Sequence, residues 1–149
     1  MKKIEIIQAK TNQDCKICDD FLSKLINYEA SLDEIINENV NVNGPAENNI
    51  KQNDVFVAYA KADKPVGYVF GYRQFAKGKI YKQNILILEA LFVETEFRGK
   101  GVGKMLVNSF ENWAKEKYED FVIEITYINA NKNAQKFYES MGYSSVKTH

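Results

Sequence analysis

The sequence contains few of the residues that would assign it to a specialised class of protein. Of its 149 residues, only two are cysteines, two are prolines and one is a histidine, His149. The pair Cys15 and Cys18 and one histidine supply too few ligands for a zinc site, so no metal is expected. Because cytosolic thiols stay reduced, we expect these cysteines to be small apolar groups on the first helix rather than a redox pair.

Long apolar runs and net charge are absent as well. No stretch of ~18 apolar residues occurs, so no membrane-spanning helix is expected. The 20 basic and 20 acidic side chains give a formal net charge of zero, which argues against electrostatic binding to nucleic acid or to a membrane. Glu5, Gln8 and Lys10 interrupt the start before a signal-peptide core is complete, so the sequence predicts a cytoplasmic protein.

The length and the 45% hydrophobic content fit a single domain over residues 1–149. The apolar pattern predicts strands at 4–9, 55–60, 66–75, 85–93, 121–128 and 143–146. Helices are expected from a cap at Asn12 or Asp14 to about Tyr28, and at 31–38, 102–114 and 131–141. The Asn-rich segment 39–53 is expected to be a surface loop.

The segment 98–104, Arg-Gly-Lys-Gly-Val-Gly-Lys, is the most informative part of the chain. It follows the apolar run 85–93 and precedes an amphipathic helical pattern, so it connects a buried strand to a helix. Glycines let backbone N–H groups approach a ligand, and the helix start adds partial positive charge. The segment therefore predicts a site for phosphate oxygens.

Three kinds of phosphate-binding loop compete for this segment. A P-loop is excluded because Met105 stands where a hydroxyl is needed and Arg98 stands where the first glycine is needed. A dinucleotide loop is disfavoured because Lys104 replaces its third glycine. The pattern [QR]-x-x-G-x-[GA] fits completely, with Arg98, Gly101 and Gly103 in place. An ordinary glycine turn without a ligand is the structural alternative.

A second motif lies one strand further along the chain. Residues 131–143 have the form N-x-x-A-x-x-F-Y-x-x-x-G-[FY], from Asn131 through Tyr138 to Tyr143. The two motifs, in this order and spacing, resemble the GNAT superfamily of Gcn5-related N-acetyltransferases. The resemblance implies an α/β (α+β) fold. Its sheet would be mixed and mostly antiparallel, with about six strands, helices on both faces and a splay between the fourth and fifth strands. Because six residues follow Tyr143, we expect the last strand of the family to be missing or supplied differently.

The resemblance implies acetyl-CoA as the cosubstrate. Backbone N–H groups of the glycine loop would hold the pyrophosphate, with charge added by Arg98 or Lys104, and strand 91–93 would lie beside the pantetheine arm. Asn131 would contact the coenzyme, or cap its helix, or do both. Tyr138 would protonate the departing thiolate, because phenol and thiol have reference pKa values within ~2 units. The expected coenzyme contacts are Leu91, Phe92, Val93, Arg98, Gly99, Lys100, Gly101, Val102, Gly103, Lys104, Asn131 and Tyr138.

Glu89 is the expected catalytic base. The segment 88–99 resembles that of spermidine/spermine N-acetyltransferases, in which the matching Glu is the proposed base. Strand alternation places Glu89 on the same face as Ile87, Leu91 and Val93, where partial burial would raise its pKa. Glu89 would alternatively bind the cationic amine, or only pair with a neighbouring Lys. Glu124, on the next strand, is the second candidate for the base.

These expectations describe an N-acetyltransferase that moves the acetyl group of acetyl-CoA to a primary amine of a small cationic acceptor, polyamine- or diamine-like or aminoglycoside-like. The expected acceptor contacts are Tyr28, Glu29, Glu89 and Glu124. A peptide N-terminus, a lysine or an amino acid remains open as the acceptor, as does a non-catalytic acyl-CoA-binding regulatory module. The 19 aromatic residues leave room for a homodimer interface.

Overall fold

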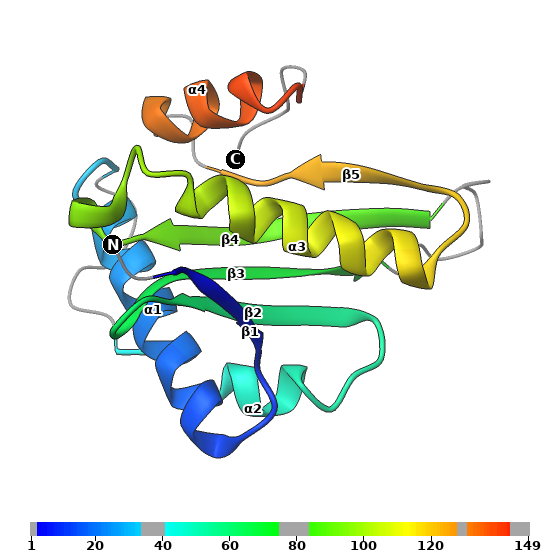
Figure 1. Ribbon diagram of the computed structural model, residues 1–149, viewed down its shortest axis with the longest axis horizontal. Coiled ribbons are helices and arrows are strands. Elements are labelled where there is room, and N and C mark those ends of the chain that lie inside the picture. Colours follow the sequence, from blue (N-terminus) through cyan, green and yellow to red (C-terminus); the bar gives the residue numbers. More distant parts are fainter. Residues whose placement is uncertain (1–2, 34–40, 75–83, 128–130, 144–149) are drawn as a thin grey trace.

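A five-stranded sheet forms the centre of the molecule (Figure 1). The computed structural model describes residues 3–33, 41–74, 84–127 and 131–143. Neighbouring strands are antiparallel from β1 to β4, and β5 is parallel to β4. The strands are β1 (Glu5–Gln8), β2 (Val55–Lys61), β3 (Pro65–Gln74), β4 (Asn84–Val93) and β5 (Phe121–Ile125). The mixed, mostly antiparallel sheet is confirmed with five strands, and the sixth, expected at 143–146, lies beyond the described residues except for its first.

Helices cover both faces of the sheet. The helices α1 (Asn12–Ala30) and α2 (Pro45–Asn49) lie on one face, and α3 (Val102–Lys117) lies on the other (Figure 1). The 3-10 turn η1 (Thr95–Phe97) joins β4 to α3. The last helix, α4 (Lys132–Ser140), lies beyond β5 and packs into the same core as α3. Among the described residues, no helix combines the length and the apolar character that crossing a bilayer requires.

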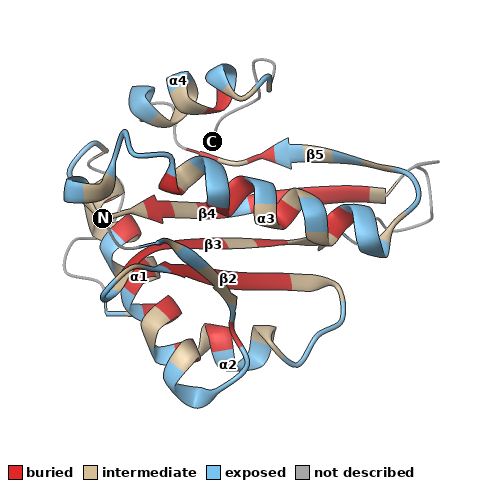
Figure 2. Cartoon of the chain, viewed as in Figure 1, coloured by how far each residue is buried: buried red, intermediate tan, exposed pale blue. Residues whose placement is uncertain are grey.

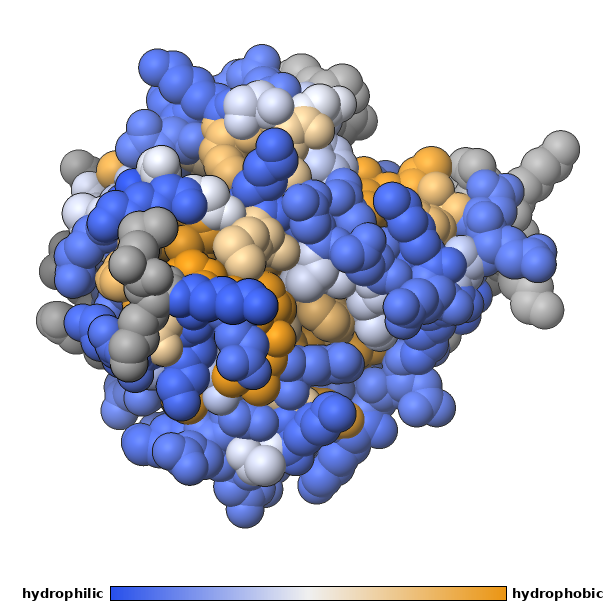
Figure 3. Space-filling model, viewed as in Figure 1, coloured by the Kyte–Doolittle hydropathy of each residue, from blue (hydrophilic) through white to orange (hydrophobic). Residues whose placement is uncertain are grey.

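Two cores, one on each face, hold these layers together (Figure 2). On one face, Leu86 and Leu88 of β4 pack with Phe110 of α3. Burying a side chain of this size contributes roughly 1.5–3 kcal/mol. On the other face, Tyr68 packs with α1, whose Cys18 is buried as a free thiol. The solvent side of α3 is mostly hydrophilic, and apolar surface shows there only in patches (Figure 3).

The first helix begins and ends at other residues than expected. Its cap is Thr11, whose Oγ1 accepts a hydrogen bond from the Asp14 N–H at 3.1 Å. The Asp14 carboxylate in turn accepts one from the Thr11 N–H at 3.2 Å, which completes a capping box. At its other end the helix runs on to Ala30, so Tyr28 and Glu29 belong to its last turn.

The prediction of a loop over 39–53 is wrong for residues 45–49, which form α2. Pro45 suits the first position of a helix, because its missing N–H would have no partner there. A tertiary contact completes the start of α2: the buried carboxylate of Asp19 accepts from Gly44 N–H at 2.8 Å and Ala46 N–H at 3.1 Å. Of the helix expected at 31–38, Ser31 is the C-cap of α1, and residues 34–40 lie outside the described part of the chain.

The sheet opens between its fourth and fifth strands. The parallel pairing of β4 with β5 runs from Asn84 opposite Phe121 to Leu88 opposite Ile125. One further hydrogen bond joins Thr126 N–H to Leu88 C=O at 3.1 Å. Because β4 continues to Val93, its last residues have no pairing with β5. This confirms the expected splay, and the opening holds the candidate functional site.

Candidate functional site

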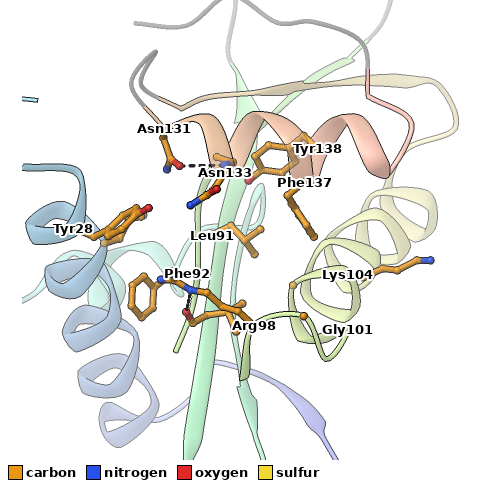
Figure 4. Close-up of a pocket in the computed structure, with 15 residues that line it drawn as sticks. Tyr28, Leu91, Phe92, Arg98, Gly101, Lys104, Asn131, Asn133, Phe137 and Tyr138 are labelled. Carbon is orange, nitrogen blue, oxygen red and sulfur yellow. Dashed lines mark hydrogen bonds between the residues drawn. The ribbon is translucent and has the colours of Figure 1, made fainter. Parts of the chain in front are cut away.

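A cavity of about 490 Å³ occupies the opening beside the end of β4 (Figure 4). It is bounded by the end of β4, the connection to α3 with the first turn of that helix, α4 and its cap, and the second half of α1. The lining residues are Leu25, Tyr28, Leu91, Phe92, Val93, Arg98, Gly99, Gly101, Gly103, Lys104, Asn131, Asn133, Ala134, Phe137 and Tyr138. Ten of the twelve expected coenzyme contacts are therefore brought together by the fold.

The glycine loop supplies the backbone groups of the cavity. Gly99 and Gly101 have φ angles of +77° and +85°, in the left-handed region that glycine adopts without a steric penalty. Gly101 is the N-cap of α3, and because glycine has no side chain, it does not cap the N–H groups at the helix start. The first N–H groups of a helix have no partner within it, so Val102, Gly103 and Lys104 can each present one to a ligand. The arrangement suits an anion.

Gly103 allows α3 and α4 to approach one another closely. A Cβ at this position would lie 3.2 Å from two ring carbons of Phe137 on α4. Contacts that short are tighter than ordinary packing, so a larger residue would displace the Phe137 ring or the start of α3. The last position of the [QR]-x-x-G-x-[GA] pattern thus has a packing reason as well as a role in the loop.

Two expected coenzyme contacts do not line the cavity with their side chains. The side chain of Val102 is fully buried in the core between α3 and the sheet, so only its backbone N–H can reach a ligand. Lys100 is exposed, and its ammonium lies 5.3 Å from the centre of the Phe97 ring. The side chain of Lys104 extends along α3, away from the middle of the cavity (Figure 4).

Arg98 turns toward the body of the protein. Its Nε–H donates to the carbonyl of Val93 at 2.9 Å. Its guanidinium carbon lies 5.3 Å from the centre of the Tyr28 ring on α1 and 5.7 Å from that of Phe92 on β4. Arg98 therefore contacts both walls of the cavity at once.

The helix α4 contributes the polar groups opposite β4. Asn131, 8% exposed, caps this helix by accepting from the Ala134 N–H at 3.1 Å, so the cap half of its expected double role is present. Tyr138 is only 4% exposed and stacks on Tyr127 with 5.9 Å between ring centres. Burial, with smaller contributions from neighbouring acidic groups, raises the pKa of Tyr138 well above its usual range. Its phenol therefore stays protonated at neutral pH.

Four lining residues were not expected as contacts. Ala134 and Phe137 stand inside the second motif, which gives a signal for them, whereas Asn133 occupies an unspecified position of that motif. Leu25 belongs to the apolar side of α1, and only the packing of that helix beside β4 brings it to the cavity.

The expectation that Glu89 shares a face with Leu91 and Val93 is wrong. The register pairs Leu88 with Gly71 and Ala90 with Phe70, so Glu89 is the extra residue of a β-bulge. The bulge reverses the alternation, because Leu91 and Val93 pack on the α3 side whereas Ala90 packs on the α1 side. Glu89 is also exposed rather than partly buried among apolar groups.

The three other expected acceptor contacts differ in their positions. Tyr28 lines the cavity from α1. Glu29, the next residue, is half-buried, and burial followed by the charge of Glu89 raises its pKa. Glu124 is exposed on β5, where its neighbours Ile123 and Ile125 pack on the α3 side, so it points to the opposite face. None of the three carboxylates, Glu29, Glu89 and Glu124, lines the cavity itself.

Comparison with known proteins gives one family for this arrangement. The family model of the acetyltransferase (GNAT) domain matches residues 51–145. A protein of Methanocaldococcus jannaschii that is named an uncharacterized N-acetyltransferase is 29% identical over 93 residues. The matched stretch is 62% of this chain and 40% of that protein, so the chain spans about two fifths of this relative's length.

Solved structures share the fold over nearly the whole chain. A tetramutant of the BH1408 protein from Bacillus halodurans has a TM-score of 0.76 and 19% identity, covering 97% of this chain and 96% of that one. The aminoglycoside N-acetyltransferase AAC(6')-Iy, in complex with a CoA-linked bisubstrate analogue, has a TM-score of 0.71 and 18% identity, covering 97% and 93%. At such identities the similarity concerns the fold.

Proposed function

Because the chain belongs to the GNAT acetyltransferase family, we propose that it transfers the acetyl group of acetyl-CoA to a primary amine of a small cationic acceptor, polyamine- or diamine-like or aminoglycoside-like. One observation carries the proposal. A single cavity joins the glycine-rich start of α3 to the protonated phenol of Tyr138, with the carboxylates of Glu29 and Glu89 beyond it.

The coenzyme would occupy the end of the cavity beside α3. The N–H groups from Gly99 to Lys104 would bind the pyrophosphate, as unpaired N–H groups at helix starts bind phosphates in general. The residues of β4 after Leu88 lack a β5 partner and would pair with the pantetheine arm as with an added strand. The Oδ1 atom of Asn131 is used by the helix cap, which leaves its Nδ2 group for the coenzyme.

The acceptor would enter from the α1 side, where the acidic groups lie. A carboxylate attracts the ammonium form of an amine and can accept its proton. Glu89 stands on the bulge, and Glu29 on the last turn of α1 is close enough for the two charges to interact. This polarity, carboxylates at one end and N–H donors at the other, suits a cationic acceptor and an anionic donor.

The transfer step follows from these positions. The neutral amine nitrogen attacks the thioester carbonyl carbon, and the C–S bond then breaks. Tyr138 gives its phenol proton to the leaving sulfur. A free thiol has a pKa of about 8.5, below that of this buried phenol, so the transfer depends on the phenol being held at the sulfur while the C–S bond breaks. Glu89 takes the proton that the amine loses, directly or through a water molecule, and solvent returns a proton to Tyr138.

A panel of amines tests the proposal. Polyamines, aminoglycosides, amino acids and peptides are each incubated with acetyl-CoA, and the released thiol is measured. We expect thiol release with a cationic amine, and a fall in kcat/KM of roughly 10²-fold for Glu89→Gln, the usual size for loss of a general base. Glu116→Gln, an exposed carboxylate on α3, is the matched control and should leave the rate unchanged.

Two results would contradict the proposal. Coenzyme A binding without turnover on any amine of the panel would favour a regulatory module. Normal turnover in Glu89→Gln would remove Glu89 as the base and leave Glu29 and Glu124 as the carboxylates to substitute next.

A further inference from the structure

The position of Arg98 in the glycine motif suggests a cation for the coenzyme phosphates, yet its side chain is already bound within the fold. The Nε–H group donates to the Val93 carbonyl at 2.9 Å, which directs the guanidinium away from the glycine loop. Figure 4 shows the side chain reaching from the loop toward α1, on the opposite side from Lys104. The backbone N–H of Arg98 is engaged as well, with the Thr95 carbonyl at 3.2 Å.

The guanidinium lies between aromatic rings from two different elements. Its carbon is 5.3 Å from the ring centre of Tyr28 on α1 and 5.7 Å from that of Phe92 on β4. Both distances are within the range of cation–π contacts. A planar guanidinium can stack on a ring while its Nε donates in the same plane, which a lysine ammonium cannot do. Arg98 thus joins the α1 wall of the cavity to the β4 wall.

A second contact joins the same two segments. The ammonium of Lys24 lies 2.7 Å from a carboxylate oxygen of Glu94. Lys24 and Tyr28 are one turn apart on α1 and so lie on one face of that helix. Glu94 and Arg98 flank the 3-10 turn between β4 and α3. Two separate side-chain contacts therefore fix α1 against this connection.

We propose that Arg98 is a positioning residue, which holds Tyr28 and the last turn of α1 against β4 and thereby sets the affinity for the amine acceptor, while backbone N–H groups hold the coenzyme phosphates. The inference rests on the proposed function for its acceptor side. It assigns Arg98 to the acceptor wall, although its place in the motif assigns it to the coenzyme.

The test compares Arg98→Gln and Arg98→Lys with the wild-type protein. Both variants lose the stacked guanidinium, but Arg98→Lys keeps the positive charge. We expect KM for the amine to rise roughly three- to tenfold in both, the size of one or two exposed cation–π contacts, with kcat nearly unchanged. The Kd of coenzyme A, measured by calorimetry, should stay within about twofold in both. Lys117→Met removes a cation–π contact on Trp113 outside the cavity and should change neither value.

Substitutions at Tyr28 separate positioning from direct contact. Tyr28→Phe removes the hydroxyl, so its KM for the amine gives the direct contribution of that group while Arg98 can still stack on the ring. Tyr28→Leu removes it and should raise the KM of the amine, with little further rise when Arg98→Gln is added, because both substitutions remove one contact. Fully additive effects, or a large loss of coenzyme A affinity in Arg98→Gln alone, would overturn the proposal.

A readout without turnover keeps this inference distinct from the proposed function. In Arg98→Gln, the backbone amides of the last turn of α1 should exchange hydrogen faster, because the contact that holds this turn is gone. Unchanged exchange there would overturn the positioning role. A complete lack of turnover in the wild-type protein would instead defeat the proposed function and leave the exchange result valid.

Discussion

The two ends of the cavity are built in different ways. The proposed coenzyme end comes mainly from one continuous segment, residues 91–104, and would bind largely through backbone groups. The proposed acceptor end combines side chains of α1 and α4 that line the cavity with the carboxylate on the β4 bulge beside it. These three elements are more than 40 residues apart in the chain. A backbone site depends on local conformation, which glycines mark in the sequence. A side-chain site depends on tertiary packing, which leaves no such mark.

Removing the hydroxyl of Tyr138 should have the largest effect on activity and should separate the chemical step from coenzyme binding. For Tyr138→Phe we expect kcat to fall by roughly 10²–10³-fold, because general acid catalysis contributes about that much. The buried ring remains, so the Kd of coenzyme A and the melting temperature should change little. Steady-state kinetics and calorimetry on the same preparation measure both.

Tyr143→Phe is the matched control for this substitution. Its hydroxyl donates to a carboxylate oxygen of Glu111 at 2.6 Å, outside the cavity. We expect a loss of about 1 kcal/mol in the free energy of unfolding and a normal kcat. If Tyr138→Phe and Tyr143→Phe reduce kcat equally, the role of Tyr138 as the acid is wrong.

A methyl group in the glycine loop should weaken the binding of coenzyme A without a global effect on the protein. Gly101 has a φ of +85°, a conformation that costs an alanine roughly 1–2 kcal/mol. We expect Gly101→Ala to raise the Kd of coenzyme A about tenfold, since the loop must distort to accept the methyl group. Gly44→Ala, at a φ of +105° before α2, carries similar strain far from the loop. Equal losses of coenzyme affinity in both variants would show a global effect instead.

Glu29 should make the free energy of unfolding of the protein depend on pH. Burial and the charge of Glu89 raise its pKa above the unfolded value of 4.5, so the native state binds more protons than the unfolded state between the two pKa values. The free energy of unfolding therefore falls as pH rises through this window. Glu29→Gln should lack this pH dependence, and at pH values above the window it should be more stable than the wild-type protein. Urea unfolding from pH 4 to pH 8 measures the difference, and parallel pH curves would exclude the effect.

The contact between Lys24 and Glu94 should have the smallest effect. The two side chains are 51% and 19% exposed, and an ion pair of this kind is worth about 0–1 kcal/mol. We expect Lys24→Met to lower the free energy of unfolding by less than about 1 kcal/mol, with the difference shrinking in high salt. A larger, salt-independent loss would mean that the contact acts through packing.

The parts of the molecule that the sequence predicted correctly share one property. The glycine loop, the Asn131 cap and the opening beyond Leu88 follow from short motifs or from the fold that these motifs imply. The bulge at Glu89 was not predicted, because one extra residue does not change the apolar composition of the strand. Its effect is to move the side chains that follow it to the opposite faces of the sheet. The start of α2 was missed because its partner, Asp19, is 25 residues away.

The close approach of Gly103 to Phe137 has a further consequence. Phe137 is the covalent neighbour of Tyr138, so the first turn of α3 and this proposed proton donor are mechanically linked through a single ring. A coenzyme that shifts this turn would transmit the motion to the phenol, and an acid held in this way is aligned by the same molecule whose sulfur it must protonate.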